Sequence, residues 1–130
     1  MIALDTNILV RILIDDKAQM SQVKLARQFA EKHQPLFIPQ LVQAELVWVL
    51  DFSYQLDKSE ILHILKHLHQ NDAFVLQNEV HFEAALHLFE TSNVSFSDCL
   101  ILKASQEADC QVATFDKRFS KLPQVKLLSI

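Results

Sequence analysis

The chain has 130 residues, half of them hydrophobic, a length and composition that predict one compact domain over residues 1–130. Its 12 basic and 16 acidic residues give a net charge of −4, so it has no global positive field to attract nucleic acid. The chain has no glycine, which excludes a phosphate-binding P-loop and a dinucleotide fingerprint, because both need glycine for close backbone approach.

The N-terminal stretch is predicted to form a strand over residues 1–5 and then a helix from Thr6 to Ile14, whose apolar residues recur at helical spacing. Asp5 and Arg11 interrupt this apolar stretch, and it has neither a basic leader nor a small-residue cleavage site. No signal peptide is therefore expected. No apolar run approaches the roughly 18 residues of a membrane helix, so no membrane partner is expected.

The rest of the chain is predicted to alternate helices with short strands. The next elements are a helix capped by Ser21 and ending near Lys32, with Val23, Leu25, Ala26 and Phe29 facing inward, a strand over residues 36–38, an apolar helix containing Glu45, and a helix starting at Lys58 or Ser59. A strand over residues 73–76, helices over residues 79–91 and from Ser97 to about Glu107, and strands over residues 111–113 and 125–128 follow. This alternation predicts a three-layer α/β/α fold with a parallel central sheet of about five strands.

Several residue types that often form functional sites are predicted to have structural roles here. Cys99 and Cys110 make neither a disulfide framework nor a metal knuckle, and we expect small buried residues of a protein in the reducing cytoplasm. His63 and His67 have the spacing of a zinc helix, but at about 100° per residue they fall opposite the apolar stripe and should face solvent. Trp48 and most of the nine phenylalanines are expected in the core, without forming a stacking platform.

Four acidic residues lie where the hydrophobic segments end or break: Asp5, Glu45, Asp98 and Asp116. In open parallel sheets, ligands bind beyond the carboxyl ends of the strands, so acids that follow successive strands can converge. Carboxylates gathered in one cleft repel each other unless a cation relieves the repulsion. Four hard oxygen ligands suit Mg²⁺ or Mn²⁺, which can activate a water and orient a phosphodiester. The pattern therefore predicts metal-assisted phosphodiester hydrolysis.

Each acid taken alone also has a structural explanation. Asp5 can cap a helix, Asp98 suits the positive end of a helix dipole, and Asp116 can belong to an ordinary turn. Glu45 is harder to explain, because its helical neighbours are the large apolar residues Leu41, Val42, Trp48 and Val49. Glutamate is almost never fully buried without a partner, so we expect Glu45 to be paired or metal-bound, with an exposed position as the alternative.

The densest basic cluster of the chain follows Asp116 and consists of Lys117, Arg118 and Lys121. Such a run is usually a solvated turn. Beside a cation site, however, the same three side chains can attract a phosphodiester, so we also consider them as phosphate- or RNA-binding residues.

In the order and spacing of these motifs the chain resembles the PIN-domain family. The motifs are Asp5-Thr6-Asn7 after the first strand, Glu45 in the next apolar helix, Ser97-Asp98 at the start of a later helix, and Thr114-Phe115-Asp116 after a late strand. The length is similar to that of single-domain toxic ribonucleases of the VapC type, and the resemblance spans essentially the whole chain. One departure is Ala108-Asp109-Cys110 in a turn where the family often has glycine, although aspartate tolerates such turns.

The resemblance implies a PIN-like parallel α/β fold and an endoribonuclease that depends on Mg²⁺ or Mn²⁺. It implies metal ligation by Asp5, Glu45, Asp98 and Asp116, two or three of which bind directly at once. It implies that Asn7 and Thr114 support the site by hydrogen bonding. It also implies an RNA substrate, a homodimer, and a small cognate antitoxin that blocks the site.

Three other classes of protein fit the sequence less well. A receiver-like phosphorylation domain needs an acidic pair directly after the first strand, whereas Asp15-Asp16 come about ten residues later, beyond a predicted helix. A phosphatase with an aspartyl nucleophile needs a second aspartate where this chain has Asn7. A non-catalytic module that keeps the fold and acts only through a protein partner is the more serious alternative, although the presence of all four acids disfavours it.

Overall fold

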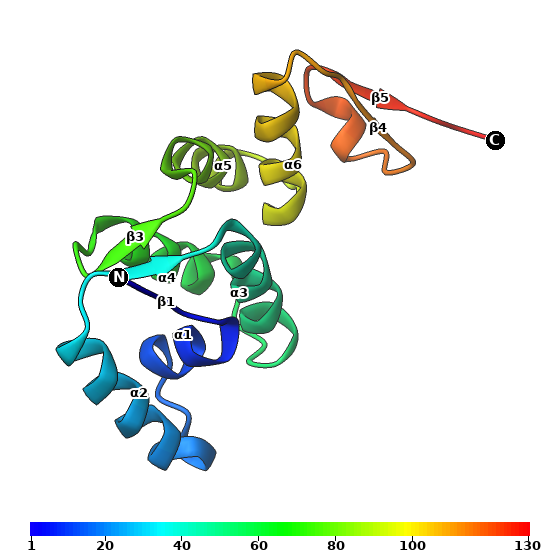
Figure 1. The fold of residues 1–130 in the computed structure, drawn as a ribbon. Helices are drawn as coiled ribbons and strands as arrows, with labels where there is room; N and C mark the ends of the chain where they lie inside the picture. Colours follow the sequence, from blue (N-terminus) through cyan, green and yellow to red (C-terminus); the bar gives the residue numbers. More distant parts are fainter. The chain divides into compact units, whose positions relative to one another are not determined.

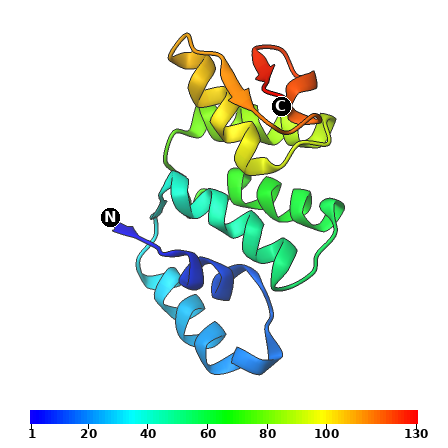
Figure 2. The ribbon, with the colours of Figure 1, turned by 90° about the vertical axis from the view of Figure 1, so that its right-hand side faces the viewer.

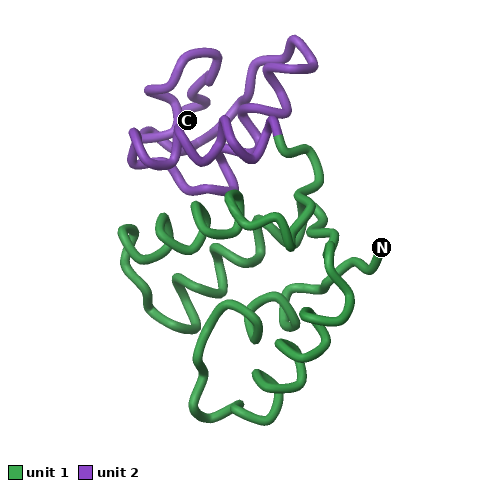
Figure 3. The backbone as a smooth tube through the Cα atoms, turned by 90° about the vertical axis from the view of Figure 1, so that its left-hand side faces the viewer, with its two compact units in different colours: residues 1–79 green, residues 80–130 purple.

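The computed structural model describes residues 1–130 and contains two compact units. Unit 1 consists of residues 1–79 and unit 2 of residues 80–130 (Figure 3). Five strands are present, as predicted, and each pairs in parallel with its neighbour. Three of them form a sheet in unit 1, and two form a separate pair in unit 2. No helix is long and apolar enough to cross a membrane.

Unit 1 is built on a parallel sheet with the strand order β1-β2-β3. Its strands are β1 (Ile2–Ala3), β2 (Leu36–Ile38) and β3 (Phe74–Leu76), and its helices are α1 (Thr6–Leu13), α2 (Met20–Lys32), α3 (Gln40–Phe52) and α4 (Lys58–Gln70). Figure 1 labels these elements apart from β2, which is the cyan arrow, and Figure 2 gives a second view of them. Both crossovers run in the same direction along the sheet, and right-handed connections then place their helices on one face. Leu36 and Ile38 are buried, whereas Phe37, which points to the other face, is only half-buried.

Side-chain caps define where the helices of unit 1 begin. Asp5 caps α1, and Asp57 and Glu60 form a capping box at α4. The prediction that Ser21 caps α2 is wrong. A 3-10 turn over Lys17–Gln19, capped by the Asp16 carboxylate, leads directly into a helix that begins at Met20, so Ser21 already lies inside the first turn.

The core of unit 1 is aliphatic. Its fully buried side chains include Leu9, Leu36, Ile38, Leu46, Leu50, Leu65 and Leu68. On α2, Val23 and Ala26 are buried as predicted and Phe29 is half-buried, but Leu25 is 68% exposed. At about 100° per residue, Leu25 points roughly 200° away from Val23, so the two cannot both face the core.

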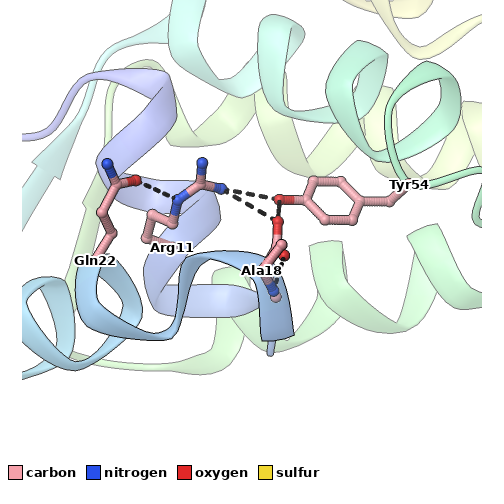
Figure 4. A network of polar contacts seen from close by, with 5 residues as sticks. Arg11, Ala18, Gln22 and Tyr54 are labelled. Carbon is pink, nitrogen blue, oxygen red and sulfur yellow. Dashed lines mark hydrogen bonds and ion pairs between the residues drawn. The ribbon is translucent and has the colours of Figure 1, made fainter.

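A polar network connects α1 with the segments that follow α1 and α3 (Figure 4). The Arg11 guanidinium donates through Nε to Gln22 Oε1 at 2.8 Å and through Nη1 to the Tyr54 hydroxyl at 2.9 Å. The Tyr54 hydroxyl in turn donates to Asp16 Oδ2 at 2.8 Å. Burial and the hydrogen bond to Asp16 raise the pKa of Tyr54, and nearby Arg11 only partly opposes this shift. Tyr54 therefore stays a neutral donor that connects the end of α3 to the loop after α1.

Unit 2 packs two helices around phenylalanine rings. The last helices and strands of the chain are α5 (Glu79–Thr91), α6 (Phe96–Glu107), β4 (Val112–Thr114) and β5 (Val125–Leu127). Phe96 makes edge-to-face contacts with Phe82 and Phe89, at centroid separations of 5.6 and 5.7 Å. β4 and β5 pair in parallel, with Val112 opposite Val125. Cys99 is buried as expected, but Cys110 is exposed in the turn that precedes β4.

Residues other than glycine make the left-handed turns of this chain. Gln55, Asn78, Asp109 and Gln124 all have φ between 53° and 66°. Asp109 directly follows the C-cap of α6 and has φ 57°, at the position where helices commonly end in glycine. The turn is thus left-handed, and aspartate tolerates this conformation in place of glycine.

Candidate active site

Asp5 lies in unit 1 between β1 and α1, beyond the carboxyl end of the first strand. Its Oδ1 accepts a hydrogen bond from the Ile8 backbone N–H at 3.0 Å, which makes Asp5 the N-cap of α1. The residue is exposed, so the cap leaves the carboxylate accessible to a ligand. Asp5 therefore has a structural role as a helix cap, and its carboxylate is also accessible to a cation.

Glu45 lies on the outer side of α3 and is exposed, the position that the sequence left as the alternative to a paired or metal-bound carboxylate. Leu46 and Leu50 take the inward positions of the helix, whereas Leu41 and Trp48, which flank Glu45, are themselves exposed. The Thr6 hydroxyl donates to Glu45 Oε1 at 3.0 Å. Because Thr6 directly follows Asp5, this contact brings the first two predicted acids into one region of unit 1.

Substitutions at Asp5 separate its structural and functional roles. Asp5→Ala removes the cap and is expected to lower the free energy of unfolding by about 1 kcal/mol, whereas Asp5→Asn keeps a good cap. Thermal melts in chelator should therefore place Asp5→Asn at or slightly above wild type, because it removes one charge near Glu45, and Asp5→Ala below both. Equal destabilisation by the two variants would mean that the charge of Asp5, and not its capping oxygen, stabilises the fold.

Asp98 lies in the first turn of α6 in unit 2. The Ser95 hydroxyl caps this helix and accepts a hydrogen bond from the Asp98 backbone N–H at 3.2 Å. The Asp98 side chain is half-buried at the positive end of the helix dipole.

Asp116 follows β4 in unit 2 and organises the turn after the strand. Its Oδ1 accepts from the backbone N–H groups of Arg118 at 2.8 Å and Phe119 at 3.3 Å. The Thr114 hydroxyl accepts from the Asp116 backbone N–H at 3.0 Å, so Thr114 fixes the backbone that presents this carboxylate. Phe119 is buried and anchors the turn.

The predicted basic cluster surrounds this turn. Lys117, Arg118 and Lys121 are all exposed. Their positive charges are thus available to a phosphate, but the same exposure is also expected of a solvated turn. Their assignment as phosphate- or RNA-binding residues stays a prediction.

The four acids are divided between the two units. Asp5 and Glu45 belong to unit 1, and Asp98 and Asp116 belong to unit 2. Neither unit by itself gathers three or more histidine, cysteine, aspartate or glutamate side chains around a possible metal position. A shared site for all four acids therefore stays a prediction. His63 and His67 are exposed on α4, as expected.

A cavity of about 830 Å³ opens beside Asp5 in unit 1. Its walls come from β1, α1 and α2 and are mostly apolar, with Ile8, Leu25 and Phe29 among the lining residues. Asn7 and Arg11, one helical turn apart on α1, contribute polar groups to the same cavity. Asn7 and Asp5 thus line the same cavity, and the supporting role of Asn7 stays a prediction.

Sequence inspection missed two residues that position this region. Thr6, the middle residue of the Asp5-Thr6-Asn7 motif, donates to Glu45, 39 residues away. Gln43 is completely buried, and its Nε2 donates to the carbonyls of Ile38 at 3.1 Å and Gln77 at 2.9 Å. A glutamine in an apolar helix was the available signal for Gln43, whereas the Thr6 contact depends on how α1 packs against α3.

The similarity of this chain to known proteins covers both of its units. The family model described as "PIN domain" matches residues 2–125. A protein named "VapC ribonuclease" from Aquifex aeolicus (strain VF5) is 26% identical over 121 residues, which cover 92% of this chain and 90% of that protein. A solved structure titled "Toxin-antitoxin complex from Klebsiella pneumoniae" covers 96% of this chain and 95% of its own, with 18% identity and a TM-score of 0.36.

Proposed function

The chain belongs to the PIN-domain family, and on this premise we propose that it is a metal-dependent endoribonuclease, the toxin of a toxin–antitoxin pair. Family membership confirms the predicted α/β class with parallel strands. The family match runs across both units and contains all four acids, so we propose that residues 1–130 act as one nuclease domain. The observation that carries the proposal is the Thr6–Glu45 hydrogen bond, which joins the Asp5 segment to α3.

Asp5, Glu45, Asp98 and Asp116 are the residues that would hold the cation. Their donor chemistry fits, because carboxylate oxygens are the ligands that Mg²⁺ and Mn²⁺ prefer. Asp5 and Glu45 are exposed, and the single hydrogen bonds recorded for their side chains use Asp5 Oδ1 and Glu45 Oε1. The second oxygen of each carboxylate is thus the natural ligand atom.

When bound, Mg²⁺ or Mn²⁺ supplies an activated water and neutralises charge on the phosphodiester. The chain's own residues would orient the reactants. Thr6 fixes the direction of the Glu45 carboxylate, and Thr114 fixes the backbone of Asp116. We assign Asn7 a supporting role beside Asp5, and Lys117, Arg118 and Lys121 a role in attracting the RNA backbone.

The biological setting is inferred from the relatives of this chain. The relative named VapC ribonuclease covers almost the whole chain, which supports an RNA substrate. We propose that the protein acts in the cytoplasm, where its exposed Cys110 stays reduced. A small cognate antitoxin would block the site, and the active form would be a homodimer, as the family resemblance implies.

The first test of the proposal is metal-dependent RNA cleavage. The purified chain should cut a single-stranded RNA in Mg²⁺ or Mn²⁺ and should stop when chelator is added, with activity returning when excess Mn²⁺ is restored. Gel analysis of end-labelled RNA would measure the rate. Cleavage that continues in chelator would contradict the proposal. Binding of a protein partner without any cleavage would support the alternative, a non-catalytic PIN-like module.

A further inference from the structure

The outer side of α3 carries a line of exposed residues, which we call the α3 stripe: Leu41, Glu45, Trp48 and Phe52. At about 100° per residue, all four lie within roughly 60° of one another. Leu41, Trp48 and Phe52 are 71%, 59% and 64% exposed, although they are large and apolar. A helix that is apolar on all sides is normally covered on all sides, so the stripe indicates a surface for a ligand.

Two aromatic rings of the stripe form a preassembled pair. The ring centroids of Trp48 and Phe52 are 4.9 Å apart, with an angle of 33° between the ring planes. Helical side chains lean toward the N-terminus of their helix, so the Trp48 indole leans toward the turn that carries Glu45. The ring pair therefore continues directly from a proposed metal ligand along one helix face.

We propose that the Trp48–Phe52 pair is a stacking platform for an unpaired base of the RNA substrate, next to Glu45. This inference rests on the proposed nuclease function and names how the substrate is positioned. The sequence of α3 contains Glu45 and Asp51 but no lysine or arginine, so the stripe has no cation of its own to bind a phosphate. An aromatic face accepts any base, because every base has a π-face. The α3 stripe is thus suited to contact a base of the RNA and not the phosphate backbone of the RNA.

A second copy of the chain fits the stripe less well. Taking an aromatic side chain as about 150–250 Å², the three apolar residues expose roughly 400 Å² together. A standard interface takes about 800 Å² from each partner, so the stripe alone is too small for a stable dimer. A copy seated on the stripe would also cover Glu45. One or two bases need far less area and leave the carboxylate accessible.

The only tryptophan of the chain is Trp48, so its fluorescence reports directly on the platform. The Asp98→Asn variant, in Mg²⁺, would be titrated with a single-stranded oligoribonucleotide of about eight nucleotides, a length within the range that one binding module covers. Stacking should quench the emission with the same dissociation constant that fluorescence anisotropy of labelled RNA gives. An abasic oligomer of the same length should bind more weakly and leave the emission unchanged.

Three substitutions distinguish stacking from simple apolar contact. Trp48→Leu keeps apolar bulk but removes the ring, and it should weaken RNA binding by about 5- to 100-fold, the range expected for one stacked base. Trp48→Phe keeps a ring and should retain most of the affinity. Val80→Ala, the control at an exposed apolar residue of α5 outside the stripe, should bind like wild type. The slope of log affinity against log salt should not change in Trp48→Leu, because no phosphate contact is lost.

Each result of these binding and cleavage experiments leads to a different conclusion. RNA that binds and is cleaved by wild type without changing the Trp48 emission, or with full affinity in Trp48→Leu, would overturn the platform alone. An RNA that neither binds nor is cleaved would overturn the platform together with the nuclease. A Trp48→Leu variant that loses self-association in sedimentation but keeps its RNA affinity would assign the stripe to a dimer interface. A large loss of thermal stability in Trp48→Leu would show that the indole belongs to the core.

Discussion

Replacing any one of the four acids by its amide should reduce RNA cleavage by more than about 100-fold, because residues that only support metal ligands already cost 10- to 100-fold. The variants are Asp5→Asn, Glu45→Gln, Asp98→Asn and Asp116→Asn. Each keeps the shape of the side chain and removes one charged metal ligand. The measurement is the initial rate of cleavage of end-labelled RNA over a series of Mn²⁺ concentrations.

Two control variants, both in unit 1, make this result interpretable. Glu31→Gln changes the net charge by the same amount at an exposed position of α2 and should cleave like wild type. Thr6→Val removes only the hydrogen bond to Glu45 Oε1, so its loss should be intermediate, about 10- to 100-fold. Equal activity in wild type, Asp5→Asn and Asp98→Asn would eliminate the proposed mechanism. Loss confined to Asp5→Asn and Glu45→Gln would restrict the site to unit 1.

Local signals in the sequence were sufficient to place the helices. The structure begins α5 at Glu79 and ends it at Thr91, as predicted, because apolar periodicity and the flanking turns fix both ends. Ser21 failed as a cap because Asp16 starts a 3-10 turn first. Serine and aspartate are comparable caps, so the sequence contains no local information that would choose between them.

The surroundings of Glu45 and Trp48 were predicted less well for a physical reason. An exposed Glu45 was only the alternative because its neighbours three and four residues away are apolar, but α3 has apolar residues on all sides and so has no unique inward face. Which side is buried depends on the rest of the fold, because α1 packs against α3 and Gln43 donates to the carbonyls of Ile38 and Gln77. The Thr6–Glu45 contact likewise joins residues 39 positions apart, and no local pattern encodes it. Asp98 and Asp116 were predicted from their places at the ends of hydrophobic segments, and the order of the family's motifs supports the same two residues.

Gln43→Glu is the substitution expected to destabilise the fold most. Gln43 is completely buried, and its amide donates to two backbone carbonyls, those of Ile38 and Gln77, at the ends of β2 and β3. A carboxylate at this position faces two acceptors and has no donor, so the free energy of unfolding at neutral pH should fall by about 3 kcal/mol. Urea denaturation followed by circular dichroism would measure the change.

Gln43→Leu is the matched control, because it removes the same two hydrogen bonds without adding a charge and should cost about 1–2 kcal/mol. Burial raises the pKa of an introduced carboxyl above its unfolded value, and the protonated form can donate to one carbonyl. The deficit of Gln43→Glu should therefore be small at acid pH and grow as the pH rises through the carboxyl range. Equal stability of Gln43→Glu and wild type at neutral pH would mean that Gln43 does not anchor α3. Another interaction would then have to fix the position of α3, and with it Glu45 and Trp48 on the opposite side of the helix.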